Sequence, residues 1–225
     1  MHKLGIDQTF RAAYPEASIG ILGLENVTNC ESDARLDDRK AALEAQLCAR
    51  FKGLARADLQ QIEPMRSYIS YYKRFRKSYH VLLQLESIVS GSRTIPHANG
   101  LVEAMFMAEL KNQVLTAGHD AAVLRPPLRA SVATGSETFV TMSGRSQALA
   151  RGDMFVEDAE GVLSAVLHGP DARTKIETTT TAALYVVYAP QGVTRMAIVA
   201  HLDDIRENVS LFSPGVEVTR LEVLG

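Results

Sequence analysis

The alternation of apolar and polar positions predicts helices in the first half of the chain and strands in the second. Residues 33–51 carry apolar side chains at helical spacing among many charges, which predicts a surface helix capped by Ser32 or Asp33. A denser helical stretch follows at 65–89, in which Ser78 is the expected cap of a second helix over 79–89. Asn99 is the expected N-cap of a further helix with an apolar stripe.

Short apolar runs between glycine, proline and acidic turns predict strands in most of the remaining chain. The expected strands are 17–24, 121–124, 130–133, 138–142, 154–156, 162–167, 183–188 and 216–223. The run 183–188 is dense enough in apolar residues to be buried on both faces. Thr194 is the expected cap of a helix that extends to about Phe212.

This order of elements predicts an α+β fold with a mixed, largely antiparallel sheet and flanking helices, because helices and strands are segregated rather than alternating. We expect a single domain over residues 1–225. A helical block at about 33–115 would pack on a β-rich block at about 120–190, followed by a helix and a strand at 194–225. With 225 residues and 46% hydrophobic content, such a domain can bury a sizeable core.

The composition of the chain excludes several classes of protein. The formal net charge of −2 excludes a protein that coats nucleic acid over its whole surface. Cys30 and Cys48 form neither a disulfide framework nor a metal-ligand motif, and the first residues lack a signal-peptide core. No apolar run approaches the length that spans a bilayer. We therefore expect a cytoplasmic protein with no membrane partner, while nothing in the sequence indicates an oligomeric state.

Familiar catalytic motifs are missing from the sequence. It contains no G-x-S-x-G elbow, no P-loop and no G-x-G-x-x-G turn. The six histidines are dispersed, and no two have the spacing of a zinc-binding helix. We expect no metal and no cofactor, so any catalysis would depend on positioning a water molecule and a charged substrate.

Basic and aromatic residues are interleaved in residues 66–79, and two interpretations are open. In the first, this stretch contacts nucleic acid, with aromatic rings stacked on bases. The cations that would contact phosphates are then Lys73, Arg74, Arg76 and Lys77. In the second, the aromatic rings belong to the core and the cations form its solvated rim.

A polar insert at 173–182, containing four consecutive threonines, separates two of the expected strands. It is too polar for a core and too short for a helix, so we expect a shaped surface segment of the kind that often carries function. Arg173 and Lys175 in this insert either bind phosphate or keep an exposed strand edge from pairing.

Several spaced motifs occur in a fixed order along the chain. They are Ile95-Pro96 with Asn99 and Leu101-Val102-Glu103, then Gly118-His119-Asp120, Gly152-Asp153, Asp158-Ala159 with Gly161-Val162, and Arg173-Thr174-Lys175-Ile176 with Thr180. Together they resemble the free-standing B3/B4 domain proteins, relatives of the B3/B4 editing module in the β subunit of bacterial phenylalanyl-tRNA synthetase.

The resemblance implies a three-layer sandwich and a stand-alone deacylase that hydrolyses a mischarged aminoacyl ester at the 3′ end of a tRNA without a metal. It places the pocket between the Asn99 helix, a turn at Gly118 and the segment 169–180. The catalytic residues that it implies are Glu177, Thr180 and His119. The substrate-binding residues that it implies are Asn99, Gly118, Gly169, Thr174 and Thr178.

The chain departs from the synthetase pattern at two points, which keeps a second function open. Where the synthetase module has a histidine three residues before an aspartate, this chain has Ala117, with His119 two residues later. Where many free-standing members read T-E-D-T, this chain reads E-T-T-T. The alternative function is a non-catalytic module that holds an amino acid or an RNA end, with Glu177 as a surface charge and His119 as a turn residue.

Overall fold

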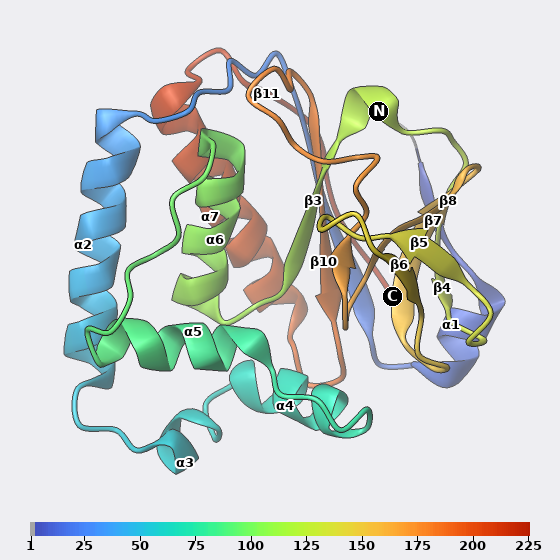
Figure 1. Ribbon diagram of the computed structural model, residues 1–225, viewed down its shortest axis with the longest axis horizontal. Helices are drawn as coiled ribbons and strands as arrows, with labels where there is room; N and C mark the ends of the chain where they lie inside the picture. Colours follow the sequence, from blue (N-terminus) through green and yellow to red (C-terminus); the bar gives the residue numbers. More distant parts are fainter. Residues whose placement is uncertain (1–2) are drawn as a thin grey trace.

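The computed structural model describes residues 3–225 and has three layers (Figure 1). Long helices form the layer at the left, a four-stranded sheet stands in the middle, and a five-stranded sheet lies at the right. The predicted α+β class, with mixed and largely antiparallel sheets and flanking helices, is confirmed.

The helices begin close to the residues predicted from their caps. They are α1 (Gln8–Ala13), α2 (Ala34–Phe51), α3 (Arg56–Leu59), α4 (Met65–Lys73), α5 (His80–Val89), α6 (Gly100–Asn112) and α7 (Arg195–Phe212). The side chains of Asp33, Asn99 and Thr194 accept hydrogen bonds from the first turns of α2, α6 and α7. The predicted Ser78 cap of α5 is wrong, since the helix starts after Tyr79 without a side-chain cap.

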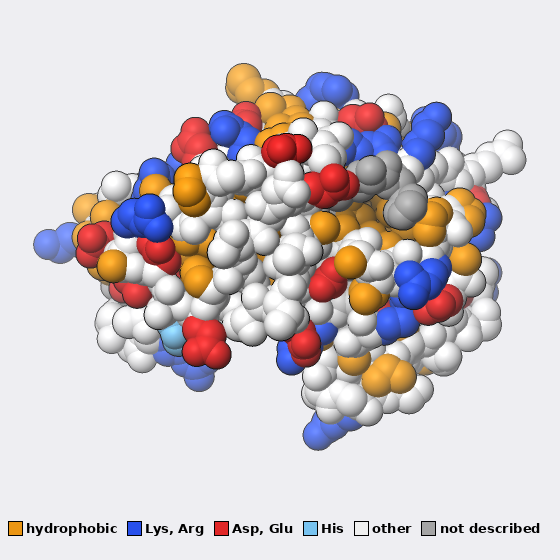
Figure 2. Space-filling view, turned by 90° about the horizontal axis from the view of Figure 1, so that it is seen from above, with side chains coloured by type: hydrophobic (Ala, Val, Ile, Leu, Met, Phe, Trp, Pro, Cys, Tyr) orange, Lys and Arg blue, Asp and Glu red, His pale blue; other side chains and the backbone are white. Residues whose placement is uncertain are grey.

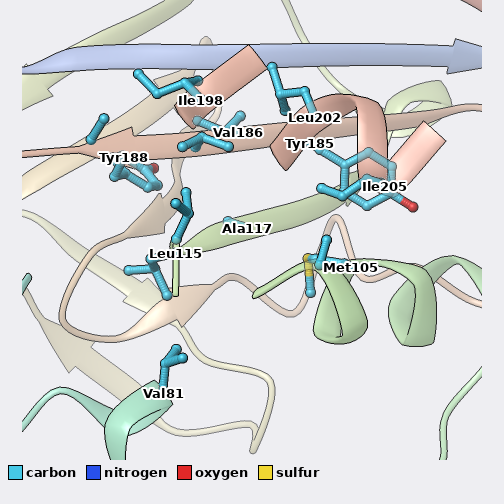
Figure 3. Close-up of a cluster of buried hydrophobic side chains, with 14 of the residues drawn as sticks. Val81, Met105, Leu115, Ala117, Tyr185, Val186, Tyr188, Ile198, Leu202 and Ile205 are labelled. Carbon is cyan, nitrogen blue, oxygen red and sulfur yellow. The ribbon is translucent and has the colours of Figure 1, made fainter. Parts of the chain in front are cut away.

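The central sheet has the order β11-β2-β10-β3, and every neighbouring pair is antiparallel. Its strands are β2 (Ser18–Glu25), β3 (Thr116–Asp120), β10 (Ala183–Ala189) and β11 (Glu217–Leu224). Ile198 and Leu202 of α7 are buried against Gly20 of β2, in the hydrophobic cluster that also contains Tyr185, Val186 and Tyr188 of β10 (Figure 3). A Cβ atom on Gly20 would lie 2.4 Å from Ile198 Cγ2, so only glycine lets α7 approach β2 this closely.

The outer sheet has the order β1-β4-β7-β8-β9 and contains the one parallel pair of the two large sheets, β1 with β4, among the described residues. Its strands are β1 (Leu4–Ile6), β4 (Leu128–Val132), β7 (Met154–Asp158), β8 (Gly161–Ala165) and β9 (Gly169–Pro170). The strands β5 (Thr138–Val140) and β6 (Ser146–Ala148) form a separate hairpin.

The strand predicted at 121–124 and the turn predicted at Gly118 are both wrong. The strand in this region is β3, which ends at Asp120, just before the predicted range. Gly118 lies in the middle of β3 and is paired with Tyr185 of β10. Asp120 ends the strand because its side chain accepts a hydrogen bond from Ala122 N and starts a 3-10 turn, η1 (Ala121–Val123). Gly118 therefore serves close packing rather than chain reversal.

The tyrosines of residues 66–79 are buried, which supports the core interpretation of this stretch. Tyr68, Tyr71, Tyr72 and Tyr79 are each at most 3% exposed. Their hydroxyl groups donate to buried acceptors, among them Tyr188 O and Asp153 Oδ1. These rings are unavailable for stacking on nucleic-acid bases. The cations Lys73, Arg74, Arg76 and Lys77 are exposed around them.

Candidate ligand-binding site

A cavity of about 400 Å³ lies beside the edge strand β3, between α6 and the segment that follows β8; we call it the α6–β3 cavity. Its volume falls within the range of about 300–1,000 Å³ typical of small-molecule sites. Most of its lining is apolar: Val102, Met105, Phe106, Leu115, Ala117, Met142, Ala165, Val166, Leu167 and Ile176. The polar groups that line it are Glu109, Thr116, Gly118, His80, His168, Lys175 and Tyr188.

The edge strand β3 presents the unpaired main-chain groups of Gly118 to this cavity. Tyr188 N donates to Leu115 O, and hydrogen-bonded pairs alternate along an antiparallel ladder. The main-chain N–H and C=O groups of Ala117 and His119 therefore point toward β10. Thr116 N and Asp120 N point the opposite way and bond to other segments. Gly118, halfway between them, must therefore direct its N–H and C=O outward, where no described residue hydrogen bonds to its N–H.

Glu109 of α6 is a buried carboxyl on the cavity wall. Glu109 is 3% exposed, and its Oε1 accepts a hydrogen bond from Thr116 N at 2.7 Å. The other oxygen has no hydrogen-bond partner among the described residues. Burial raises the pKa of Glu109 to about 8, and the Thr116 bond opposes that shift only in part. An acid in such an environment is a candidate functional group.

The wall opposite α6 is fixed by buried polar groups. Asp153 accepts hydrogen bonds from Leu167 N and from the hydroxyl of Tyr71, and Tyr72 donates to Val166 O. Burial raises the pKa of Asp153 to about 7 although these hydrogen bonds favour its charged form. These hydrogen bonds hold in place the segment 166–167, which lines the cavity.

The polar insert forms a lip over the cavity. Asn99 Nδ2 donates to Ile176 O at 3.3 Å, and Asn29 Nδ2 donates to Glu177 O at 2.8 Å. The two asparagines, which also bond to each other, attach the insert to the start of α6. Lys175 and Ile176 line the α6–β3 cavity on one side of this lip and a shallower hollow of about 530 Å³ on the other.

Thr180 and Glu177 occupy different environments in the insert. Thr180 is 2% exposed, and its hydroxyl donates to Asp120 Oδ2 at 2.7 Å and accepts from Glu177 N at 3.0 Å. The Glu177 carboxylate is exposed, 3.5 Å from the ammonium group of Lys175, and borders the shallower hollow with Thr178. Thr180 therefore shapes the lip, whereas Glu177 is open to a ligand. Their catalytic assignment stays a prediction.

His119 lies at the centre of a buried chain of hydrogen bonds between the two sheets. Thr174 donates to Asp171, so His119 Nδ1 donates to Thr174 Oγ1, and His119 Nε2 accepts from Ser164. Ser164 also bonds to Tyr188, whose ring lines the cavity. Burial lowers the pKa of His119 to about 3, which keeps the ring neutral. His119 and Thr174 are fully buried and do not line either hollow.

The predicted RNA-binding cations are placed unequally around the site. Lys175 lines the cavity, and Lys77 lies close enough to His168 to add to the effect of burial, which lowers the pKa of that ring. Arg173 is instead held by the carboxylates of Asp158, Glu160 and Asp171. Arg74 lies over the ring of Tyr14, in a separate hollow.

Charge on the visible upper face is mixed rather than uniformly basic (Figure 2). Lysines and arginines alternate there with acidic side chains, and the outline is notched between the helical side at the left and the β-rich side at the right. Any contact with an anionic partner would therefore be local, as the mild net charge also indicates.

One cluster in the described part of the chain has metal-ligand chemistry. Ligand atoms of Asp37, His97 and Glu103 lie within 4.8 Å of one another. The ammonium group of Lys40 lies 3.0 Å from the carboxylates of both Asp37 and Glu103. The lysine already supplies the positive charge that a metal would bring.

The helices of the described residues include none with the length and apolar content that a membrane span requires.

Comparisons with known proteins show only a distant likeness in fold. No family model matches the chain, and the search of curated proteins found no match. Among solved structures, an N-terminal fragment of the phenylalanyl-tRNA synthetase β subunit from Pyrococcus horikoshii is similar, with a TM-score of 0.49 and 13% sequence identity. The likeness covers 96% of this chain and 50% of that one. We infer no function from so weak a likeness.

Two buried acids give a prediction for the pH dependence of stability. The pKa values of Glu109 and Asp153, about 8 and about 7, lie above those of exposed carboxyls. The folded chain therefore holds protons that the unfolded chain releases, and this stabilisation is lost as the pH rises through the folded pKa values. We expect the free energy of unfolding to rise as the pH falls from about 8.5 to about 6.5, by up to about 1.4 kcal/mol per pH unit and group.

Urea unfolding at several pH values measures this trend. The window ends near pH 6.5 because His119 and His201, whose pKa values burial lowers, oppose the trend below it. Asp153→Asn is expected to flatten the lower part of the profile, below about pH 7, because Glu109 alone gives the slope above it. A free energy of unfolding that falls between pH 8.5 and pH 6.5 would contradict the assignment of the two acids.

Proposed function

We propose that the α6–β3 cavity binds an amino-acid-like ligand, either a free amino acid or the aminoacyl group of an ester. The observation that carries this proposal is the combination of a largely apolar cavity with the unpaired main-chain groups of Gly118. An apolar side chain fits the lining from α6 and Ile176, while the polar end of an amino acid can pair with the N–H and C=O of an edge strand.

The position of the lip favours an ester as the ligand and hydrolysis as the reaction. Lys175 stands where the cavity meets the shallower hollow, and Glu177 borders that hollow with its carboxylate exposed. A ligand held by its side chain would present its carboxyl end to this boundary. A carboxylate there can accept a proton from water, and a lysine can contact a phosphate of an RNA 3′ end.

A non-catalytic module is the second candidate, and the burial of His119 favours it. Its ring nitrogens bond to Thr174 and Ser164, and the ring does not reach the cavity. Among the predicted catalytic residues, only Glu177 then remains open to solvent, and no histidine base stands at the lip in the described part of the chain apart from His97, which bonds to Glu103.

The purified protein separates the two functions when it is incubated with mischarged aminoacyl-tRNA. We expect release of the amino acid, reduced at least about tenfold in Glu177→Ala if that carboxylate moves a proton. Thr180→Ala is expected to weaken ligand binding about tenfold because two hydrogen bonds that shape the lip are lost, whereas Thr180→Ser retains them.

Thr181→Ala serves as the matched control, since this threonine is exposed on the same insert and lines neither hollow. Salt-sensitive binding of tRNA without turnover would select the module over the enzyme. A protein that binds neither tRNA nor any of a panel of apolar amino acids and their esters would contradict both.

A further inference from the structure

The unpartnered carboxyl of Glu109 indicates what the ligand carries at its polar end. A buried carboxylate without a positive partner is costly, so such groups are normally paired, or else protonated. Here the nearest hydrogen-bond donor is a main-chain N–H, from Thr116, and no described lysine or arginine forms an ion pair with Glu109. The open oxygen therefore faces the cavity without a cationic partner, since Lys175, which also lines the cavity, pairs with Glu177.

We propose that Glu109 binds the free ammonium group of the ligand, so that the cavity accepts amino acids and aminoacyl esters and rejects their N-acylated forms. This inference rests on the proposed function, because it requires an amino-acid-like ligand in the α6–β3 cavity. An ammonium group donates to the open oxygen while Thr116 N still donates to the other. The ligand's carboxyl end then points away from Glu109, toward Lys175 and the lip.

Proton release follows from this arrangement. In the empty cavity Glu109 is mostly protonated at neutral pH, because burial raises its pKa to about 8. Contact with an ammonium group favours the carboxylate, so binding expels close to one proton at pH about 7. Affinity for an amine therefore rises up to about tenfold per pH unit until the pH passes about 8.

The other ionisable groups around Glu109 do not take the place of the ligand's ammonium group as its positive partner. They are the hydroxyls of Tyr68, Tyr72 and Tyr79 from α4 and the start of α5, His80 of α5, His168 after β8, Lys175 of the insert, and His201 of α7, which bonds to Thr116 Oγ1. Burial raises the pKa values of the tyrosines and lowers those of the three histidines, so all of them are neutral near pH 7. Lys175 pairs with Glu177.

Calorimetric titration with 2-phenylethylamine and 2-phenylethanol tests the inference, because the two probes differ only in the ammonium group. At pH about 8.5 we expect the wild-type chain to bind the amine about 10- to 100-fold more tightly. Glu109→Gln keeps an oxygen for Thr116 N and is expected to bind both probes equally. N-acetyl-L-phenylalanine is expected to bind far more weakly than L-phenylalanine.

The outcomes separate this inference from the proposed function. If both probes bind with equal affinity, or if Glu109→Gln still prefers the amine, the role of Glu109 is overturned and the cavity stands as a ligand site. If neither probe nor any apolar amino acid binds, the proposed function and the inference are both overturned. Titration of the wild-type chain in two buffers of different ionisation enthalpy gives a readout that needs no variant. Absence of proton release on amine binding at pH about 7 overturns the inference.

Discussion

Replacing Gly118 by valine is expected to abolish ligand binding in the α6–β3 cavity while the chain remains folded. A Cβ atom at Gly118 would lie 2.9 Å from Ile176 Cδ1 and 3.3 Å from Met105 Sδ, and both of these side chains line the cavity. Both are flexible at the contacting end, so they can relieve the clash by moving into the volume that a ligand would occupy. We expect affinity for apolar amino acids to fall at least about 100-fold.

Calorimetric titration measures this loss, and Gly215→Val is the matched control because a Cβ there would meet nothing within 4 Å. Overpacking at Gly118 costs about 1–3 kcal/mol of stability, which urea unfolding quantifies separately. A folded Gly118→Val protein with unchanged affinity would move the ligand away from β3 and contradict the assignment of the cavity.

Replacing His119 by leucine is expected to lower the free energy of unfolding by about 2–3 kcal/mol. The substitution leaves the hydroxyls of Thr174 and Ser164 without their shared partner in the space between the sheets. Ser164→Ala, which removes one end of the chain of hydrogen bonds, is expected to cost about half as much. Urea denaturation monitored by circular dichroism measures both changes.

The same variant separates a structural from a catalytic role. We expect His119→Leu, when folded, to keep the ligand affinity of the wild-type chain because the imidazole does not line the cavity. A His119→Leu protein as stable as the wild type but devoid of turnover would show that the histidine takes part in the reaction. That result would restore the role that the motif resemblance implies.

Local signals in the sequence predicted the helix ends and the position of the insert well. Asn99 and Thr194 cap helices because each side chain satisfies a main-chain N–H of its own first turn, a relation that spans only a few residues. The polar insert at 173–182 was recognisable because its composition excludes it from a core. Both kinds of inference need no knowledge of distant contacts.

The parts that could not be predicted depend on contacts between distant residues. Gly118 reads as a turn residue in sequence, and only its pairing with Tyr185 makes it part of a strand. No local signal marks Glu109 as buried, since its burial depends on the approach of β3. The sequence leaves open whether Arg173 binds phosphate or protects a strand edge, and the fold brings three carboxylates to it.

The backbone amide of Gly118 is the most direct reporter of the proposed site. We predict that titration of the ¹⁵N-labelled chain with L-phenylalanine, L-methionine and L-leucine will shift the Gly118 resonance saturably for at least one of them, together with that of Ile176. If none of these amino acids, nor their methyl esters, shifts Gly118 at about 10 mM, the cavity does not bind an amino-acid-like ligand.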